Sequence, residues 1–462
     1  MATASNVLKY ISSNEIKWID LQFIGVEGNL NRVSISSKEF GADEFTKGVG
    51  TPDLSEVYTD EDAKDLVLSP DPETFARVPW ENRSIRMLCD VMHAINKERY
   101  LKDPRYIAGH TETNLKALGV TSAHLSSEVE FYVFDNVSLD RTKSGQSASH
   151  LIDSREANWT PSPFWNNEKG AYVNQPFDSI SGGRGQIAET LDENYNYPVN
   201  YHSHGRAPTS QQRIGIKRKS LKTAADALVT LKSIARNSAF LTSTLCTFMP
   251  LPIPTEVGNS LTIGQSLWKK DRNVFYDAKD NYAQISQTGR YYIGGLLEHA
   301  SALSVFTNPT VNSYARLKKD PYYIGWSRYS VGSVVKVPYK IENDDNGKEI
   351  KFASADPSVN PYLAYSAVVA AGIDGIKRKL DPGDPVDEKI DKMDSSEKRK
   401  HKIKSLPGSL MEAMDALQND VNFLKGTITP DMLSDYLDAK LEEVKESGGE
   451  VHPQDISRYF NY

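Results

Sequence analysis

The chain has 462 residues, 39% of them hydrophobic, so it can form a large core and more than one domain. A net charge of -7 and only two cysteines, Cys89 and Cys246, give no reason to expect a nucleic-acid partner, a disulfide framework or a cysteine-based metal site. No stretch approaches the roughly 20 apolar residues of a spanning helix, and the N-terminus lacks a signal-peptide pattern, so we expect a cytoplasmic protein without a membrane partner.

The first part of the chain is predicted to form a small α+β unit. A helix is expected over Asn6 to Ser13, followed by two strands in "IKWIDLQFIGVEGNLNRVSIS", where "GVEGN" is typical of a hairpin turn. Apolar alternation in "DLVLSPDPETFARVPW" and "SIRMLCDVMHA" indicates further strands. The Asp-Pro of "LKDPRYIAG" marks a turn before a larger unit. We therefore expect two domains, residues 1–105 and 106–462.

The larger unit begins with helical spacing in "TETNLKALGV" and a strand in "SSEVEFYVFD". Apolar residues recur every three or four positions in "SLKTAADALVTLKSIARNSAFLTSTL" and in "NPYLAYSAVVAAGIDGIKRKL", which predicts two long helices. The charge run "DPGDPVDEKIDKMDSSEKRKHKIK" indicates a solvated surface excursion. Two amphipathic helices are expected after it, in "SLMEAMDALQND" and "DMLSDYLDAKLEEVKE".

The strand "SSEVEFYVFD" carries two carboxylates on one face. Successive strand side chains alternate between faces, so Glu128 and Glu130 point the same way. Like charges this close repel unless a cation lies between them. The pair fits either an exposed polar face or a divalent-metal site, since Mg²⁺ prefers oxygen ligands. The strand alone leaves both interpretations open.

Nine segments, in order, give the chain a resemblance to type I glutamine synthetase over nearly its full length. They are "DLVLSPDPETFARVPW", "CDVMHA", "DPRYIAG", "SEVEFYVFD", "TFMPLPIP", "GGLLEHASALSVFTNPTVNSYARL", "SADPSVNPYLAYSAVVAAGIDGI", "LPGSLMEAMDAL" and "HPQDISRYF". The resemblance implies an α+β fold, with an N-terminal β-grasp-like domain and a large C-terminal domain built on an antiparallel sheet flanked by helices. It also implies a homo-oligomer of two stacked hexameric rings, and association with an active glutamine synthetase stays open.

The family reaction joins ammonia to glutamate through a γ-glutamyl phosphate made from ATP, with Mg²⁺ or Mn²⁺ neutralising the phosphates. The resemblance implies that Glu130 would share one metal with two further glutamates. In this chain Gly205 stands at the first of those positions and Arg213 at the second. Two of three ligands are therefore missing, and a cation replaces one of them.

The second metal of the family would be held by Glu128, a histidine and another glutamate. Thr262 occupies the histidine position here, and Lys351 occupies the glutamate position. Again one retained glutamate faces a lost ligand and an inserted positive charge.

The groups that bind substrate and phosphate in the family are depleted too. Of its arginines, one remains as Arg328, whereas Val331 and Lys336 replace two others, and Ala353 stands where an arginine would bind glutamate. The flap segment is shortened to "KKDPYY" and lacks its glutamate. The family-matching remnants are Arg316, Arg328, Gly258 and Asp53.

Two unpaired buried carboxylates would be costly, so keeping both glutamates without metals calls for substitute cations. We therefore predict internal ion pairs between Arg213 and Glu130 and between Lys351 and Glu128. Random drift after loss of activity is the competing interpretation.

These replacements predict a catalytically inactive glutamine-synthetase-like protein, structural or regulatory, binding at most a small ligand and requiring no cofactor. The alternative is an active ATP-dependent glutamate–ammonia or glutamate–amine ligase with non-standard metal ligation, which would use ATP and Mg²⁺ or Mn²⁺. A third option is a different chemistry in the same cavity, centred on His202 and His204.

Overall fold

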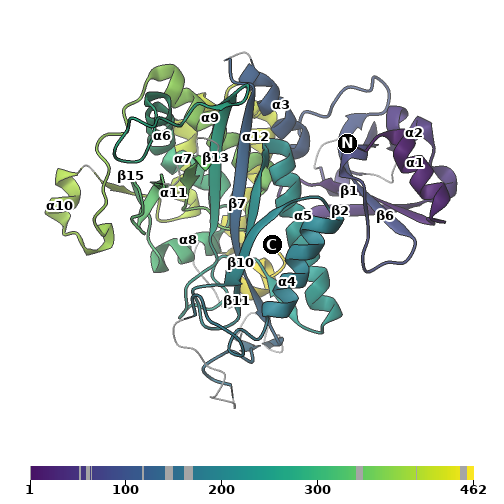
Figure 1. Ribbon diagram of the computed structural model, residues 1–462, viewed down its shortest axis with the longest axis horizontal. Helices are drawn as coiled ribbons and strands as arrows, with labels where there is room; N and C mark the ends of the chain where they lie inside the picture. Colours follow the sequence, from purple (N-terminus) through teal and green to yellow (C-terminus); the bar gives the residue numbers. More distant parts are fainter. Residues whose placement is uncertain are drawn as a thin grey trace.

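The protein is described by a computed structural model at residues 2–50, 54–58, 63, 65–116, 119–140, 149–160, 170–339, 347–401, 403–447 and 455–462. Two β-sheets organise it: a small one near the N-terminus and a large one in the remainder, with helices beside each (Figure 1). This arrangement confirms the predicted α+β class. No helix in the described ranges is long and apolar enough to cross a membrane.

The N-terminal domain holds the sheet of order β2-β1-β6-β4-β3, with β5 paired to β6. Its elements are α1 (Ala4–Ser13), β1 (Trp18–Ile24), β2 (Leu30–Ser36), α2 (Ala42–Lys47), β3 (Val49–Gly50), β4 (Leu66–Pro70), β5 (Ala76–Arg77) and β6 (Ser84–His93). The Thr3 side chain caps α1 by accepting a hydrogen bond from the Asn6 amide at 3.3 Å. Strands β1 and β2 form the predicted antiparallel hairpin, and Ile19 and Leu21 are fully buried in the domain core.

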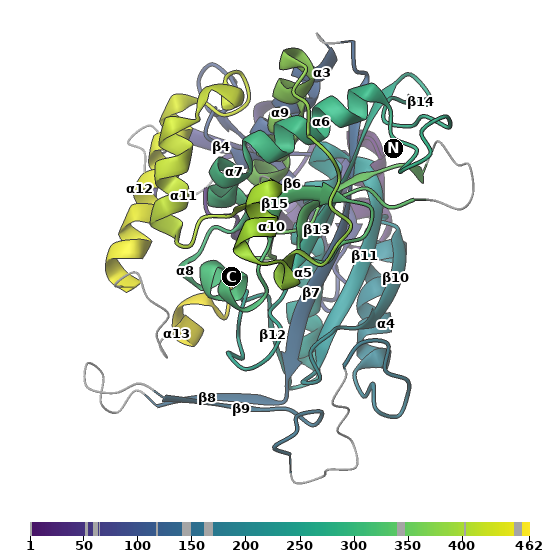
Figure 2. The same ribbon diagram turned by 90° about the vertical axis from the view of Figure 1, so that its left-hand side faces the viewer.

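The large sheet has the order β10-β11-β7-β13-β17-β16-β15-β18, with β12 on β7 and β14 on β13. Its strands are β7 (Ser122–Phe134), β10 (Val199–His204), β11 (Gln211–Ser220), β12 (Leu245–Thr247), β13 (Leu261–Lys269), β14 (Arg272–Asn273), β15 (Tyr323–Ser327), β16 (Ser333–Lys336), β17 (Ile350–Phe352) and β18 (Lys404–Ser405). The expected antiparallel pairing holds except between β15 and β16, which run parallel. A separate hairpin of β8 (Asn136–Asp140) and β9 (Ser149–Asp153) extends away from the sheet (Figure 2).

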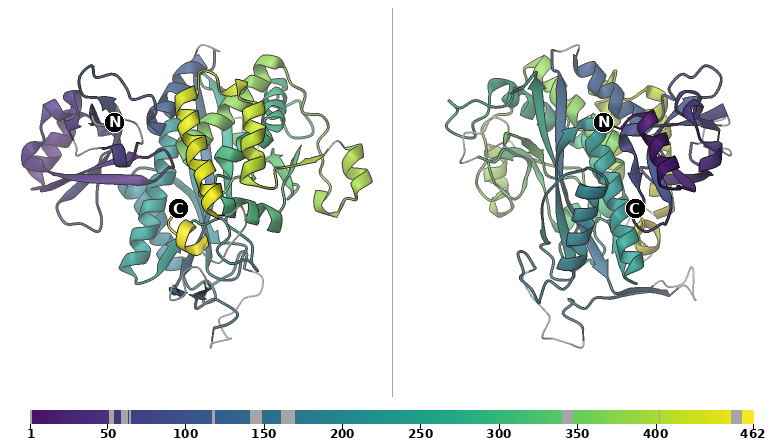
Figure 3. Two further views of the ribbon diagram at one scale, coloured as in Figure 1. Left: turned by 180° about the vertical axis from the view of Figure 1, so that it is seen from behind. Right: turned by 45° about the vertical axis from the view of Figure 1, so that its right-hand side comes forward.

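Helices cover one face of the large sheet. The helices of this larger part of the chain are α3 (Pro104–Lys116), α4 (Ser181–Glu189), α5 (Leu221–Leu241), α6 (Gln287–Glu298), α7 (Ala300–Thr307), α8 (Val311–Lys319), α9 (Pro361–Arg378), α10 (Ser395–Lys400), α11 (Leu410–Asn419), α12 (Pro430–Ser447) and α13 (Asp455–Tyr459), of which α10 lies apart, beyond β15 (Figure 1). On β7, Val129 and Phe131 are fully buried in the main core, and the Ser127 hydroxyl lies 2.5 Å from that of Tyr365 on α9. The odd-numbered residues of this part of β7 thus face the helices, and α12, in yellow, adds a further layer on that side (Figure 3).

The two domains meet at a buried arginine. Arg105 of α3 donates to Asp226 of α5 at 3.0 Å and, in the small domain, to Asp71 at 2.7 Å and to Asp90. These charge-assisted hydrogen bonds satisfy a guanidinium that is otherwise costly to bury. They fix the N-terminal domain beside α3 and α5 (Figure 1).

Candidate functional site

The pairing of β7 with β11 places the first residues of the candidate site next to one another. Glu130 stands directly opposite Arg213 in antiparallel register, and side chains opposite each other in such a ladder share a face. Because Val129 points to the helices, Glu128 and Glu130 point to the other face, together with Arg213.

The same face continues over β13, β17 and β16. Thr262 of β13 stands opposite Glu128, and Lys351 of β17 stands opposite Gly264, two residues further along β13. Lys336 of β16 stands opposite Lys351. The register therefore gathers one set of side chains, which we call the carboxylate face: Glu128, Glu130, Arg213, Thr262, Lys336 and Lys351.

Both oxygens of the Glu130 side chain accept hydrogen bonds from this chain. Arg213 donates to Oε1 through Nε at 3.1 Å and through Nη2, while Ser260 donates to Oε2 through its amide at 2.9 Å and its hydroxyl at 2.6 Å. Arg206 adds a second positive charge, with Nε 3.9 Å from Oε1. The Glu130 side chain is only 1% exposed, so these donors replace its hydration.

Glu128 lies nearer the surface and is paired with a lysine. Lys351 Nζ donates to Glu128 Oε1, and the two side chains are 24% and 32% exposed. Burial raises the pKa of Glu128, but the charge and hydrogen bond of Lys351, helped by the Tyr201 hydroxyl and by Arg213, outweigh burial and lower that pKa below its usual range.

The cationic partner of Glu130 is stabilised in its charged form. Burial lowers the pKa of Arg213, while the charge of Glu130 and the hydrogen bonds to it raise that pKa above its ordinary value. The structure thus brings Arg213 to Glu130 and Lys351 to Glu128.

Gly205 leaves no room for a ligand in its present surroundings. A Cβ added there would lie 2.6 Å from Cγ of Gln211, well inside contact distance. The Gln211 amide is itself fixed, because it donates to Asn259 at 3.1 Å and to the Gly258 carbonyl at 3.2 Å. A larger residue at this position would have to displace a buried, bonded side chain.

The remaining sequence-predicted residues are engaged elsewhere or are not described. Arg316 is buried and donates to the Ser354 carbonyl. Arg328 stacks on Tyr282, 4.7 Å from the ring centroid, and pairs with Asp387, which lies after α9, at 3.5 Å. Asp53 lies outside the described residues.

The two histidines of β10 do not reach the carboxylate face. Ser203 stands opposite Arg213, so its neighbours His202 and His204 point to the other side of the sheet. There His204 is buried with Nε2 3.1 Å from Glu156. The option of a chemistry centred on these histidines in the same cavity is therefore wrong, because strand alternation separates them from Glu128 and Glu130.

The sequence did not indicate Ser260 and Arg206 as partners of Glu130. Both lie in segments between strands, and only the folded path of those loops brings them to the carboxylate. No spacing rule would have found them.

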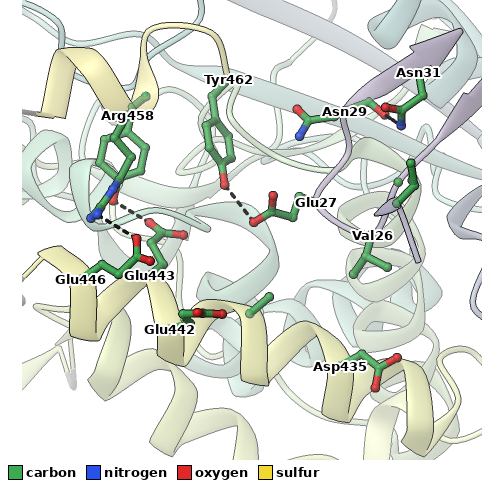
Figure 4. Close-up of a pocket in the computed structure, with 14 residues that line it drawn as sticks. Val26, Glu27, Asn29, Asn31, Asp435, Glu442, Glu443, Glu446, Arg458 and Tyr462 are labelled. Atoms are coloured by element: carbon green, nitrogen blue, oxygen red, sulfur yellow. Dashed lines mark hydrogen bonds and ion pairs between the residues drawn. The ribbon is translucent and has the colours of Figure 1, made fainter. Parts of the chain in front are cut away.

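A separate cavity of about 500 Å³ lies between α12, the hairpin segment 25–31 and Tyr462 (Figure 4). It is lined by several carboxylates, but Glu446 is paired with Arg458 at 2.9 Å, and Glu27 accepts from the Tyr462 hydroxyl at 3.2 Å. None of its lining residues belongs to the carboxylate face.

The comparisons with known proteins cover the whole chain. The profile "Glutamine synthetase, catalytic domain" matches residues 101–459, and "Glutamine synthetase, beta-Grasp domain" matches residues 15–94. The chain is 38% identical to a glutamine synthetase of Sulfolobus acidocaldarius over 98% of both chains, and 31% identical to a 3-hydroxylaminophenol mutase of Cupriavidus pinatubonensis over 99% of both. The structure of Plasmodium falciparum glutamine synthetase superimposes with a TM-score of 0.87 at 23% identity, covering 100% of this chain and 99% of that one. These matches confirm the predicted N-terminal β-grasp domain and C-terminal catalytic-type domain.

The prediction that no cofactor is needed is wrong at the level of the family. Glutamine synthetases related to this chain at 38% and 33% identity belong to a class that uses ATP and Mg²⁺ or Mn²⁺. That prediction was made from the replaced metal-ligand positions. Those positions describe one face of the sheet in this chain and do not determine which cofactors the family uses.

The donor set on the carboxylate face does not fit a divalent ion. Such an ion needs several free oxygen ligands, and the oxygens of Glu130 already accept from Arg213 and Ser260. Within the described ranges, no group of three or more histidine, cysteine, aspartate or glutamate side chains is placed to hold a metal.

Both domain profiles match, in the order found in the fold, and the full-length relatives reach 38% identity. The chain therefore belongs to the glutamine synthetase family.

Proposed function

We propose that this glutamine-synthetase-like protein does not join glutamate to ammonia at the carboxylate face, and that it acts as a structural or regulatory oligomer. The observation that supports the proposal is that both carboxylate oxygens of Glu130 accept hydrogen bonds from Arg213 and Ser260, while Glu128 is paired with Lys351. Phosphoryl transfer depends on positive charge placed at the transferring oxygens, and these cations are already neutralised by the two glutamates.

A second candidate is an active ATP-dependent glutamate–ammonia or glutamate–amine ligase with non-standard metal ligation. The identity of 38% to a glutamine synthetase over nearly the whole chain favours it. In that case ATP and Mg²⁺ or Mn²⁺ would be the cofactors. A relative named as a mutase, at 31% identity, indicates that overall similarity alone does not fix the reaction.

Turnover decides between the two candidates. The purified full chain is incubated with ATP, glutamate and ammonium, with Mg²⁺ or Mn²⁺, and both phosphate and glutamine are measured beside an active glutamine synthetase. We expect no glutamine above the level without protein. Metal-dependent glutamine formation would overturn the proposal and establish the second candidate.

Calorimetric titration with ATP and Mg²⁺ then separates the two roles. Binding without turnover supports a regulatory role, in which the nucleotide is sensed. Absence of binding supports a structural role in an assembly.

We propose that the chain assembles as two stacked hexameric rings. Native mass spectrometry would then give twelve times the chain mass, and any smaller closed assembly would contradict this. Mixing with an active glutamine synthetase before the measurement tests whether the two proteins share one assembly.

A further inference from the structure

Another cavity, separate from the one beside Tyr462, lies among the helices of the large domain. It has a volume of about 450 Å³ and is bounded by α3, α9 and the segment 422–427, which lies between α11 and α12. We call it the α3–α9 cavity. Sites for small organic molecules have volumes of roughly 300–1,000 Å³, so this cavity is large enough to hold one. None of its described lining residues belongs to the carboxylate face.

The floor of the α3–α9 cavity is apolar. It is formed by Leu115 of α3, by Val369, Ala370 and Ile373 of α9, and by Phe423, each of which is at most 7% exposed and belongs to the main core. Removing apolar surface from water is a main favourable contribution to the binding of an organic molecule. The floor therefore suits the apolar body of a ligand.

Interactions within the protein hold the walls of the cavity in place. Asn114 of α3 donates through Nδ2 to the Gly426 carbonyl, which ties the segment between α11 and α12 to α3. The ring of Phe423 stacks on the buried His299 ring, with 4.3 Å between the centroids, and His299 Nε2 lies 2.9 Å from Oδ2 of Asp374 on α9. Walls that are already ordered lower the entropic cost of binding a ligand.

The charged groups at the cavity favour an anion. Lys377 of α9 and Lys425 both line it and are exposed, and neither forms an ion pair with a carboxylate of the described residues. Asp374 is the one acidic side chain among the described lining residues, and it is paired with Arg378 at 2.9 Å. Asp420 does not line the cavity, and its Oδ2 lies 2.6 Å from the ring of the buried histidine. Two positive charges thus face a cavity whose lining carboxylate already has a cationic partner.

We propose that the α3–α9 cavity binds a small organic anion, with its apolar body on the floor and its carboxylate or phosphate at Lys377 and Lys425. An ammonium group forms charge-assisted hydrogen bonds with either kind of oxyanion. An inorganic anion would leave the apolar floor in contact with water, and an uncharged molecule would leave both lysines unused. The inference goes beyond the proposed function and does not depend on it, because the cavity shares no described residue with the carboxylate face.

Three probes with the same aromatic body test the site: naphthoate, naphthyl phosphate and the uncharged naphthylmethanol. Ligand-observed NMR titrations on the full chain give their dissociation constants for the parent, Lys377→Gln, Ala370→Leu and Lys445→Gln. Lys377 and Ala370 are the diagnostic positions, because Lys425 also lines a neighbouring apolar cavity. Lys445→Gln is the matched control, since Lys445 is an exposed lysine of α12 that lines neither cavity.

At least one anionic probe should bind the parent more tightly than naphthylmethanol does. Lys377→Gln removes one charge-assisted hydrogen bond, so it should weaken the binding of the anionic probes about tenfold and leave that of naphthylmethanol unchanged. Ala370→Leu fills part of the floor and should weaken every probe that binds the parent. Lys445→Gln should change none of the dissociation constants. The anionic probe that binds more tightly distinguishes a carboxylate ligand from a phosphate ligand.

The inference would be overturned if neither anionic probe bound, or if the anionic probes and naphthylmethanol bound equally well. Parent-like affinity in Lys377→Gln or in Ala370→Leu would place the probe elsewhere and would overturn it too. Circular dichroism and thermal melts establish that the variants are folded, and if Ala370→Leu is not, the exposed Lys377→Gln still decides. Glutamine formation from ATP, glutamate and ammonium would contradict the proposed function and leave this inference standing.

Discussion

Truncation of Arg213 to alanine removes the principal counter-charge of Glu130. The carboxylate is 1% exposed and would keep the two hydrogen bonds from Ser260, with Arg206 still 3.9 Å away. Breaking a buried ion pair by removing one partner costs about 3–5 kcal/mol. Because two donors and a second arginine remain, we expect the lower end, about 3 kcal/mol.

Chemical and thermal unfolding measure this loss. At an unfolding entropy of about 2 cal/mol/K per residue, about 3 kcal/mol corresponds to a fall in melting temperature of roughly 3 °C for a chain of 462 residues unfolding as one unit. The double variant Glu130→Gln, Arg213→Gln replaces the charges by amides and should recover much of the loss. Arg378→Ala is the control, since that arginine is 49% exposed and its (i,i+4) pair with Asp374 is worth about 0.5 kcal/mol or less. If Arg213→Ala unfolds like the parent, or the double variant is no better than the single one, the reasoning is refuted.

Lys351→Ala should lower the free energy of unfolding, measured in urea, by about 1 kcal/mol. The loss is smaller than for Arg213→Ala because the pair with Glu128 is partly exposed. The pKa of Glu128 is lower in the folded protein than in the unfolded chain, so the pair contributes its full stability above the ordinary glutamate pKa and loses it as the pH falls through the folded-state pKa. The free energies of unfolding of parent and Lys351→Ala should therefore converge in acid. A difference that stays constant with pH would contradict this. Arg105→Ala removes the buried cation shared by three aspartates at the domain junction, and among the described residues only Asp71 and Asp90 keep a second basic partner, Lys222 and Arg99. The free energy of unfolding should therefore fall by about 3 kcal/mol, the lower end for a broken buried pair, with faster proteolysis between the domains as the readout. Burial, with a smaller effect from the neighbouring Arg236, lowers the pKa of Lys232 to about 7. Between pH 7 and about pH 10.4 the unfolded chain therefore binds one more proton than the folded protein, and the free energy of unfolding should rise with pH across that window. Lys232→Met should be more stable than the parent at pH 7 and should lack that rise; a less stable variant would count against the assignment.

Most of the fold could be predicted because its elements carry strong periodic signals. The helix α5 repeats apolar residues at three- and four-residue spacing, and β7 alternates Val129 and Phe131 inward with Glu128 and Glu130 outward. The parallel pairing of β15 and β16 could not be predicted, since each strand has five residues or fewer and leaves little room for a pattern.

The candidate site was predictable only in part. The positions of Arg213 and Lys351 came from family resemblance, and the strand register then explains how each reaches a glutamate. Ser260 and Arg206 were missed because loop contacts leave no periodic signal. The position of Lys336 opposite Lys351 was missed as well, because strand register is known only from the folded sheet.

The chemistry of fixed cations differs from that of metal ions. A lysine or arginine brings one positive charge and hydrogen-bond donors, whereas a divalent ion brings two charges and acts as a Lewis acid on a phosphoryl oxygen. On the carboxylate face, Arg213 and Lys351 have their charge cancelled by Glu130 and Glu128, which leaves little to stabilise the charge of a transferring phosphoryl group. A face built in this way lacks the free positive charge that phosphoryl transfer needs, and for that reason glutamine formation by the purified chain is the decisive measurement.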